Sequence, residues 1–403
     1  MLKKYAWSKH EEEGLAPATH AQGMRCGQMV WIAGQGGMAR PGDAREQTRR
    51  AMQRVHSVLD ELGCDAVDLV KLLCFYVPDD GFDEDTCLAS LASMLPAGAR
   101  PAVTMIPVSY LSHPGMRVLI EGAAMRDADG ARLPRQYVPR ASGESGLPAP
   151  FETVVRCGKM IFVSGQAAIV KGQCAHPGDI LGQTRQAMQQ VGRALAAFGA
   201  TFDDVVKVNR WYVGRGRVED FEPAALACAA HFNEPGPAAT GIPLANLAYD
   251  GELIRIEVVA MLGEDGERLP RRHAWPDSLW DWTTHLPYQH GLKCHDMIFL
   301  GGQVSLDKHG RAVSAGDMEP QTRQAMTHIG TILHELDAGY ADICKLTTMY
   351  EGRCGVDELD VNRRVRSSFF EAPRMPMTDV PQPVLAYPGM IIEIDAFAVV
   401  EPD

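Results

Sequence analysis

The sequence predicts an α+β protein built from three tandem copies of one domain. The hexapeptide Gln-Thr-Arg-Arg-Ala-Met at 47–52 returns in nearly the same form at 183–188 and 321–326, at intervals of 136 and 138 residues. Lys71, Lys207 and Lys345 keep the same register. Several landmarks that hold one period indicate triplication of a unit of roughly 135 residues, a common domain size. We expect the domains at 1–136, 137–272 and 273–403.

Each copy opens with an apolar strand that closes on glycine and glutamine. These strands are expected at 29–35, 160–166 and 297–303. Short β-branched and aromatic runs that end in glycine are typical of strands that bring backbone close to a neighbour. A helix with one apolar stripe follows, running from Met52 to Leu62 in the first copy. Gly63 and Gly199 stand where a left-handed helix end is expected, and the third copy has Asp337 there.

A second strand, a second helix and a final strand complete each copy. The second strands are expected at 70–77, 206–213 and 344–350, the second helices at 88–95, 221–232 and 359–370, and the final strands at 117–124, 253–261 and 390–400. Each copy is therefore predicted to be a β-rich α+β domain with two helices on one face. The other, apolar face needs cover, and three copies can supply it by packing their sheets around a pseudo-threefold axis.

The composition excludes several classes of protein. With 46% hydrophobic and 22% charged residues, the chain is an ordinary globular one. Its net charge of −12 opposes a nucleic-acid partner, because phosphate binding needs a basic surface. No apolar run is long enough to span a membrane, and the first residues lack the apolar core of a signal peptide. We expect a cytoplasmic protein without a cofactor.

Cysteines and lysines repeat at fixed positions in the three copies. The cysteines Cys26, Cys157 and Cys294 share one position, but the chain has no Cys-x-x-Cys pair and no Cys/His array with metal-ligand spacing. We therefore expect buried core thiols in a reducing compartment and no metal. The three repeated lysines are expected to be solvated charges at strand edges.

The order of motifs resembles the RidA/YjgF enamine/imine deaminase family. The matching features are a strand with Ser-Gly-Gln, a helix that opens Gln-Thr-Arg-Gln-Ala, Asp-Val-Val-Lys before a strand, Pro-Ala-x-Thr, and a closing Ile-Glu strand. The resemblance covers nearly the whole chain, three times over. It implies a chorismate mutase-like fold in which three domains form a trimer with a central β-barrel, outer helices and active sites in clefts between domains. Here that trimer is expected as one fused chain.

The arginine that pairs with the substrate carboxylate in this family is missing from all three copies. The repeated threonines are Thr104, Thr240 and Thr378, and alignment on them places Val103, Ala239 and Met377 at that position. Arg100 and Arg374 lie three residues earlier, and a shift of three residues along an extended chain moves a side chain by roughly 10 Å. The resemblance leaves Arg374 as a candidate for substrate binding and indicates a substrate other than the usual 2-imino acid, or one that presents its charge differently.

Other family positions survive mainly in the third copy. The resemblance matches Tyr288 to the tyrosine ahead of the first strand and Asn362 to the asparagine of the second helix. It matches Glu393 to the glutamate that positions the hydrolytic water. The counterparts of Glu393 in the other copies are Leu119 and Arg255. We therefore expect unequal clefts, with the chemistry where the third copy meets a neighbour.

The candidate site combines residues of two copies. Glu393 and Asp379 are expected to divide the acid and base roles, with Tyr288 as the third catalytic candidate. Arg255 or Ser164 from the second copy can complete the site. Backbone amides near Gly302 and Asp379 are expected to hold a developing negative oxygen.

Each of these residues also has a structural explanation. Glu393 can belong to a buried ion pair, Arg255 can pair with a carboxylate across copies, and Tyr288 can cap the core. The polar stretch 209–211 is interpreted as an exposed face or a contact between copies.

The function predicted from these features is that of a cofactor-free hydrolase acting on a C–N bond of a small polar metabolite. Two alternatives stay open. One is a non-catalytic protein that binds a small molecule in the same clefts, and the other is a cyclic amide hydrolase. The fused body can also form a further homo-oligomer.

Overall fold

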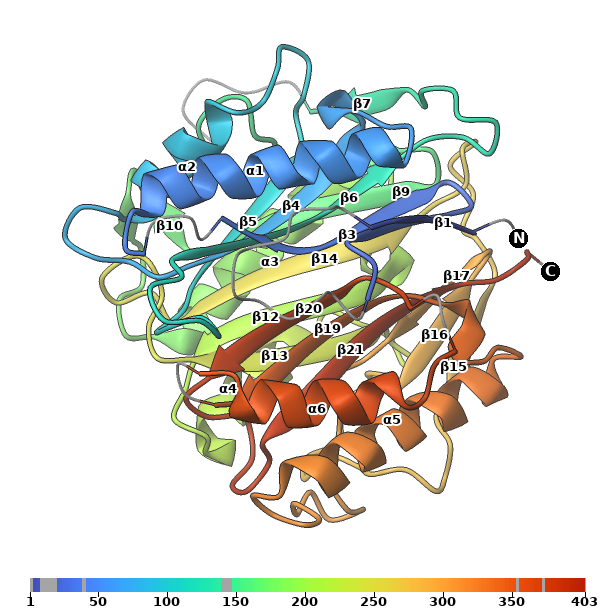
Figure 1. Cartoon of the computed structure of the whole chain (residues 1–403). Helices are drawn as coiled ribbons and strands as arrows, with labels where there is room; N and C mark the ends of the chain where they lie inside the picture. Colours follow the sequence, from blue (N-terminus) through green and yellow to red (C-terminus); the bar gives the residue numbers. More distant parts are fainter. Residues whose placement is uncertain are drawn as a thin grey trace.

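Each of the three repeats folds into a mixed sheet that carries two helices on one face (Figure 1). The computed structural model describes residues 3–7, 20–37, 41–138, 147–352, 355–371 and 374–402. Within these residues every helix and final strand expected from the sequence is present in each repeat, which confirms the α+β class and the triplication.

The helices and the strands of the main sheets follow the same order in each repeat, and the second repeat adds a separate two-stranded hairpin. The first repeat contains β1 (Lys3–Ala6), β2 (Gly23–Cys26), β3 (Met29–Gly36), α1 (Ala44–Glu61), β4 (Leu69–Tyr76), α2 (Glu84–Ala92), β5 (Ala102–Pro107) and β6 (Val118–Met125). The second contains β7 (Arg135–Tyr137), β8 (Val154–Cys157), β9 (Met160–Gln166), β10 (Ile169–Val170), β11 (Gln173–Cys174), α3 (Ile180–Ala196), β12 (Val205–Val213), α4 (Val218–Ala229), β13 (Ala238–Leu244) and β14 (Ile254–Met261). The third contains β15 (Arg271–Ala274), β16 (Gly291–Cys294), β17 (Met297–Leu300), β18 (Gln303–Val304), α5 (Met318–Glu335), β19 (Ile343–Glu351), α6 (Asp357–Ser367), β20 (Met377–Gln382) and β21 (Ile392–Val399).

The strand order is equivalent in the three sheets. It is β1-β2-β3-β6-β4-β5 in the first repeat, β7-β8-β9-β14-β12-β13 in the second and β15-β16-β17-β21-β19-β20 in the third. The last two strands of each order are parallel and the others antiparallel, because the second helix of the repeat connects the parallel pair. In the third repeat the expected first strand is divided into β17 and β18, since Gly301 and Gly302 leave the ladder between them.

The repeated glutamine of the hexapeptide has a structural role. In each repeat its side-chain amide donates to the carbonyl of a distant glycine, and its carbonyl accepts from a backbone amide two residues beyond that glycine. The pairs are Gln47 with Gly115 and Arg117, Gln183 with Gly251 and Leu253, and Gln321 with Gly389 and Ile391. The glutamine therefore ties the long helix to the loop before the final strand.

The helix ends agree with the sequence. Gly63 and Gly199 have φ angles of 78° and 75°, and Asp337 has 56°. All three lie in the left-handed region, where glycine is favoured because it has no Cβ. Asp337 accepts this conformation at an exposed position, where its carboxylate pairs with Arg272 at 2.6 Å.

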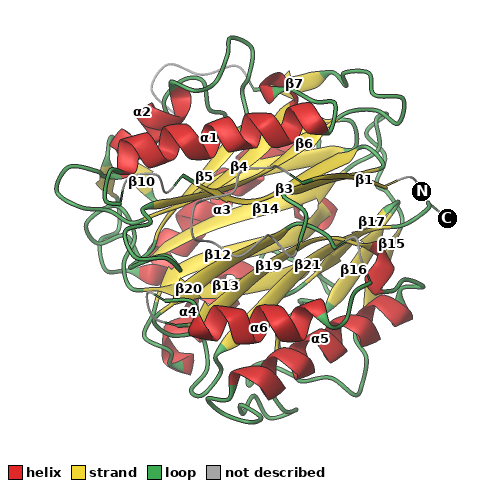
Figure 2. Ribbon diagram, viewed as in Figure 1, coloured by secondary structure: helices red, strands yellow, loops and turns green. Residues whose placement is uncertain are grey.

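The sheets face one another on the inside of the molecule, and the helices lie on the outside (Figure 2). A ring of ion pairs joins the repeats there, each with an N–O distance of 2.8 Å: Lys71 with Glu257, Lys207 with Asp395, and Lys345 with Glu121. Each lysine thus pairs with the next repeat in cyclic order. Lys207 and Lys345 are only 1% and 2% exposed, so the expectation of solvated edge lysines is wrong. The lysine-bearing strands are interior strands of their sheets, and their lysines point to the common centre.

Strand pairing does not run continuously from one sheet to the next among the described residues. Isolated bridges join Ala102 to Glu152 and Ala238 to Gln289 at the sheet borders. Apolar side chains of all three repeats form one shared core between the sheets. The three-domain arrangement around a common centre is therefore present, whereas a central barrel of unbroken hydrogen bonding is not confirmed.

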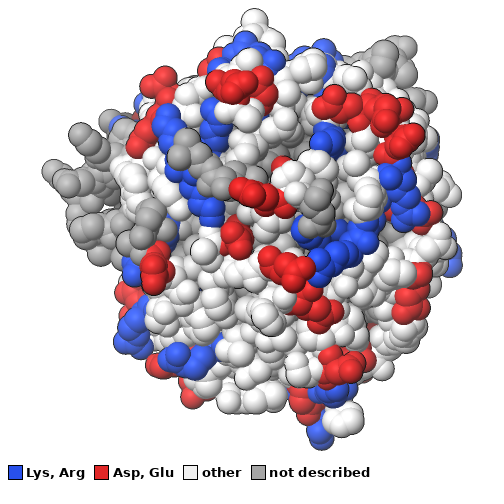
Figure 3. All heavy atoms as spheres, turned by 90° about the vertical axis from the view of Figure 1, so that its right-hand side faces the viewer, with Lys and Arg blue, Asp and Glu red and all other residues white. Residues whose placement is uncertain are grey.

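Two further expectations concern the cysteines and membrane-spanning segments. Cys26, Cys157 and Cys294 are buried free thiols, as predicted. Within the part of the chain described here, no helix has both the length and the apolar character needed to cross a membrane. On the face drawn in Figure 3, basic side chains alternate with acidic ones among the described residues.

Candidate active site

Three equivalent interfaces join the repeats. In each one the amide of a glycine donates to a threonine hydroxyl of the neighbouring repeat. The pairs are Gly165 with Thr104 at 2.8 Å, Gly302 with Thr240 at 3.0 Å, and Gly34 with Thr378 at 2.8 Å. We name these the 1–2, 2–3 and 3–1 interfaces after the repeats that they join. The repeated glycine and threonine are thus structural, and the interfaces can be compared position by position.

One side chain distinguishes the three interfaces. Each of the three glycines packs against the residue that the sequence places at the position of the family glutamate, namely Arg255 in the 1–2 interface, Glu393 in the 2–3 interface and Leu119 in the 3–1 interface. The same backbone therefore holds a cation, an acid and a hydrocarbon at equivalent places.

Arg255 fills the 1–2 interface and is neutralised there. It is buried, and its guanidinium donates to Glu252 at 2.9 Å and to Glu84 of the first repeat at 2.8 Å. It also donates to the backbone carbonyl of Met105 at 2.7 Å. Ser164, the other candidate from this repeat, is buried and accepts from Gln166. Because Arg255 is paired with two carboxylates, its guanidinium is not free to bind a ligand.

In the 3–1 interface, too, the buried charges pair with one another. Asp379 pairs with Arg366 at 2.6 Å and with Arg363 at 2.7 Å, and Asn362 accepts from Arg366. Burial alone would raise the pKa of Asp379, but the two arginines hold it well below its usual range. The backbone carbonyl of Arg374 accepts from Ala21 of the first repeat. Asp379 is thus the counter-ion of a buried arginine.

The expected joint site of Glu393 and Asp379 is not formed. Glu393 lies opposite Met349 on β19, and Asp379 lies opposite Thr348. Neighbouring residues in a strand point to opposite faces, so the two carboxylates lie on opposite sides of the sheet. Arg255 and Ser164 lie in the 1–2 interface, and Asp379, Asn362 and Arg374 in the 3–1 interface. Of the predicted residues, the structure brings Glu393 and Gly302 into contact, and Tyr288 lies in the same 2–3 interface against Arg210.

Glu393 occupies a buried position in the 2–3 interface. It is 6% exposed and accepts a hydrogen bond from the backbone amide of Gly241 in the second repeat. Burial, together with the negative charge of Asp395, raises the pKa of Glu393 to about 8, against the opposing effect of nearby Lys207. A carboxyl with this pKa can exchange protons near neutral pH, as a general acid or base must.

Gly302 makes room for this carboxyl. A Cβ atom at Gly302 would lie 1.9 Å from Oε1 of Glu393. The amide of Gly302 already donates to Thr240 and to the carbonyl of Ala239 at 3.2 Å. The expectation that this amide stabilises a negative oxygen is therefore not supported, and the space that the glycine leaves is its contribution.

Arg210 is the residue that sequence reasoning missed. It is 3% exposed, and its guanidinium stacks over two aromatic rings. The distance from its Cζ atom to the ring centroid is 5.0 Å for Phe221 and 4.9 Å for Tyr288. Its Nε and Nη1 atoms are buried without a hydrogen-bond partner among the described residues. A Cβ on Gly241, the residue whose amide binds Glu393, would lie 3.3 Å from Nη2 of Arg210. An unpartnered buried guanidinium is rare, and here it lies beside the acid of the same interface.

Tyr288 serves mainly as a wall for Arg210. Its ring lies under the guanidinium, and its hydroxyl donates to the carbonyl of Ala225 at 3.4 Å. Burial raises the pKa of Tyr288, so the hydroxyl stays protonated. The sequence offered one signal for Arg210, namely an arginine within an apolar strand. Its place in register with Gly241, the residue after Thr240, is visible only in the structure.

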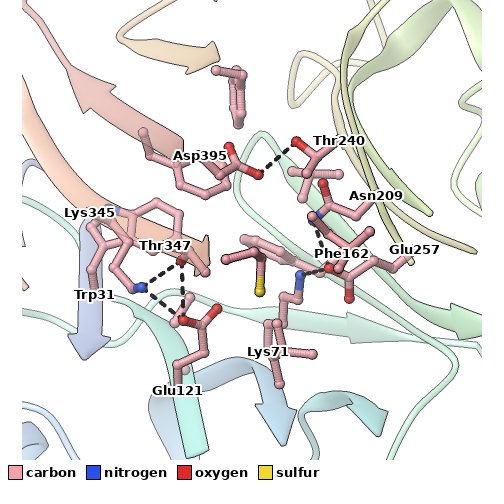
Figure 4. A pocket seen from close by; sticks show the side chains of 18 of the residues that line it. Trp31, Lys71, Glu121, Phe162, Asn209, Thr240, Glu257, Lys345, Thr347 and Asp395 are labelled. Atoms are coloured by element: carbon pink, nitrogen blue, oxygen red, sulfur yellow. Dashed lines mark hydrogen bonds and ion pairs between the residues drawn. The ribbon is translucent and has the colours of Figure 1, made fainter. Parts of the chain in front are cut away.

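Residues of all three sheets line one cavity (Figure 4), and Glu393 is among them. The centres of water molecules can occupy about 50 Å³ of it. Its walls combine aromatic rings, such as Trp31 and Phe162, with the carboxylates and lysines of the ion-pair ring. Among the described residues no cluster of side chains has the composition of a metal site.

Comparison with known proteins agrees with the repeat structure. The family model described as Endoribonuclease L-PSP matches residues 12–126, 146–262 and 282–400. A RutC family protein of Pyrococcus horikoshii is 31% identical over 113 residues, which cover 28% of this chain and 86% of the relative. A 2-iminobutanoate/2-iminopropanoate deaminase of Capra hircus is 27% identical over 133 residues, covering 32% of this chain and 93% of the relative. Among solved structures, a chorismatase matches with a TM-score of 0.54 and 15% identity over 83% of this chain and 93% of its own, a likeness of fold alone.

Proposed function

The chain belongs to the Endoribonuclease L-PSP (RidA/YjgF) family, and from this we propose that it hydrolyses the C–N bond of a small imine at the 2–3 interface. The observation that carries the proposal is the buried pair of Arg210, which has unpartnered donors, and Glu393, whose pKa is raised to about 8. The deaminase relatives act, by their names, on 2-iminobutanoate and 2-iminopropanoate. Both are small carboxylates, which a free guanidinium can bind.

Arg210 can take over the role of the missing family arginine, which is to pair with the substrate carboxylate. In the 1–2 and 3–1 interfaces every buried arginine described above has a carboxylate of the chain beside it. In the 2–3 interface Arg210 lies near Glu393, but among the described residues no carboxylate accepts a hydrogen bond from its Nε or Nη1. A substrate carboxylate would take that place, in a site where bidentate guanidinium pairing is strong because water is excluded.

The reaction requires only water and one group that exchanges protons. Ionised Glu393 would accept a proton from a water molecule while the oxygen attacks the imine carbon. Glu393 would pass this proton to the nitrogen, which gives a carbinolamine. Transfer of the hydroxyl proton to the nitrogen, again through Glu393, would then break the C–N bond and release a carbonyl compound and ammonia. The imine and water thus give the carbonyl compound and ammonia without any redox step. Positioned proton transfer of this kind contributes typically about 10²- to 10⁴-fold to a rate.

RNA cleavage is not proposed, although the family description names an endoribonuclease. The net charge of −12 opposes binding of a polyanion. A non-catalytic binding protein remains the alternative for the same interface, because a free guanidinium would also hold a carboxylate that does not react.

Ammonia release tests the proposal. The panel contains 2-iminobutanoate and 2-iminopropanoate generated in the assay. Cyclic amides, which open on hydrolysis without releasing ammonia, are followed by loss of the substrate. We expect release from a carboxylate-bearing imine, a fall in kcat of about 10²-fold or more in Glu393→Gln, and a rise in KM in Arg210→Lys. Arg215→Lys, at an exposed position in the same repeat, is the control. If no substrate releases ammonia but carboxylates bind to the wild type and not to Arg210→Gln, the protein is a binding protein.

A further inference from the structure

Glu393 lines the cavity between the three sheets, so the centre of the molecule is in contact with the proposed catalytic carboxyl. We infer that this cavity is an internal water compartment that supplies the attacking water to Glu393, from the side of the sheet opposite to Arg210. The inference rests on the proposed hydrolysis and adds the route of one reactant. It assigns a role to the middle of the fold, where residues of all three repeats meet.

The size of the cavity suits several water molecules. One water needs roughly 10–15 Å³ of space for its centre. The cavity offers about 50 Å³ by the same measure. A drug-sized molecule needs far more, since ligand pockets are typically several hundred Å³.

Polar atoms without a hydrogen-bond partner on the residues of the wall indicate which kind of molecule can occupy the cavity. Trp31, Trp211 and Asn209 line this cavity. The two indole nitrogens and the side-chain oxygen of Asn209 are buried without a hydrogen-bond partner among the described residues. Two of these atoms donate and one accepts. An occupant that satisfies all three must therefore accept and donate. Water does both, whereas an ammonium ion cannot accept and a halide ion cannot donate.

The charges of the wall also favour a neutral occupant. Glu257, Asp395 and Glu121 each pair with a lysine in the ring described above. A charged occupant would compete with one of these pairs. Glu393 is the fourth carboxyl of the wall, and no ion pair is found for it among the described residues. It is therefore the carboxyl that is free to exchange a proton with water in the cavity.

Substrate and water reach Glu393 from different sides. Asn209 and Trp211 face the cavity, and Arg210 between them points to the opposite face of β12, where it meets Phe221 of α4. This follows from the alternation of side chains along a strand. The Glu393 carboxyl lies between the cavity and Arg210, because it lines the cavity and also accepts from Gly241, against which Arg210 packs.

A crystal structure of the wild type tests the compartment without reference to activity. We expect ordered water bound to the two indole nitrogens and to Asn209, with a water in contact with Glu393. A dry cavity would overturn the inference whatever the assay shows.

A graded filling of the cavity tests the route. Val259→Ile adds one methylene group and Ala123→Leu adds three carbon atoms at buried positions of the wall. We expect kcat to fall progressively, by about tenfold or more in Ala123→Leu, with KM unchanged. Ala89→Leu, on the exposed face of α2, adds the same bulk elsewhere and should match the wild type. If Ala123→Leu does not fold, Val259→Ile and the wild-type crystal decide.

The outcomes separate the two hypotheses. An active wild type whose kcat survives a filled cavity overturns the water route and leaves the proposed hydrolysis intact. A wild type that releases no ammonia from any substrate overturns the proposed hydrolysis itself, and the water route with it.

Discussion

Lys345 of the third repeat donates to Glu121 of the first across 2.8 Å and so closes the ring that Lys71 and Lys207 begin. This contact joins residues that are 224 positions apart in the chain. Covalent linkage can hold consecutive repeats near one another, but it cannot connect the last repeat to the first. The ring therefore defines the relative positions of the sheets and the enclosed shape of the central cavity.

Loss of Lys207 should destabilise the protein strongly. Its ammonium group donates to Asp395, Thr240 and the carbonyl of Leu300 in a fully buried position. In Lys207→Met, Asp395 is left as a buried charge without its partner, which typically costs about 3–5 kcal/mol. Urea unfolding followed by tryptophan fluorescence measures the change. Lys71→Met is the matched control, and it should lose less because the Lys71 side chain is 17% exposed.

The double variant Lys207→Met with Asp395→Leu should recover most of the lost stability, because it leaves no unpaired charge. Equal stability of Lys207→Met and the wild type would show that the buried ring does not contribute to folding.

Gly302→Ala should abolish activity at a modest loss of stability. The new methyl group would meet the Glu393 carboxyl, which must then leave its place. Overpacking of this kind typically costs about 1–3 kcal/mol. Gly34→Ala is the equivalent change in the 3–1 interface, where the methyl group would meet Leu119 and Thr378 at 2.9 and 3.0 Å. We expect both variants to lose similar stability and only Gly302→Ala to lose ammonia release. Equal loss of activity in both would remove the special role of the 2–3 interface.

Glu393 should make the stability of the protein depend on pH. Its pKa is raised from 4.5 to about 8 by burial and by Asp395. The folded state therefore holds a proton that the unfolded state releases between these values. The contribution of Glu393 to the free energy of unfolding is complete below pH 4.5 and is lost as the pH rises towards about 8, by about 1.4 kcal/mol per pH unit. The difference between wild type and Glu393→Gln, measured by urea unfolding across this range, isolates the effect.

The same titration should appear in the activity with the opposite consequence. Glu393 must be ionised to accept a proton from water, so kcat should rise with pH and level off above about 8. A rate that falls through pH 8 would assign Glu393 the role of an acid and contradict the mechanism proposed here.

Much of the fold was predictable because it depends on patterns that repeat along the chain. The period of the hexapeptide, the apolar stripes of the long helices and the glycines at helix ends each have a local cause, and the structure confirms them. The ring of ion pairs was missed for a physical reason. The pairing of Lys71 with Glu257 crosses 186 positions, and a lysine in a strand gives no local sign of whether it faces water or another sheet.

The site was predictable only in part, for a similar reason. Glu393, Gly302 and Tyr288 were found by position in the repeat; the first two lie in contact, and Tyr288 lies against Arg210. Asp379 was assigned to the same site because it is close in sequence to the threonine motif, but strand alternation directs it to the other face. Arg210 was interpreted as surface or contact, because the second repeat had to be placed against the third before its missing partner could be noticed.

Asp379→Asn provides the final test of this division between structure and chemistry. The change leaves Arg366, which is completely buried, without its carboxylate. We expect a loss of about 3–5 kcal/mol in the free energy of unfolding, with kcat and KM unchanged in the fraction that stays folded, measured at low temperature.

The pKa of Asp379 is depressed, so its contribution to the free energy of unfolding is present above the usual aspartate range and is lost as the pH falls through the depressed value. Arg363→Gln removes the more exposed partner of the same carboxylate and should cost less. In the 3–1 interface the buried arginine is paired with Asp379, whereas in the 2–3 interface Nε and Nη1 of Arg210 have no hydrogen-bond partner among the described residues. A stable but inactive Asp379→Asn would contradict this difference and would indicate that Asp379 takes part in catalysis.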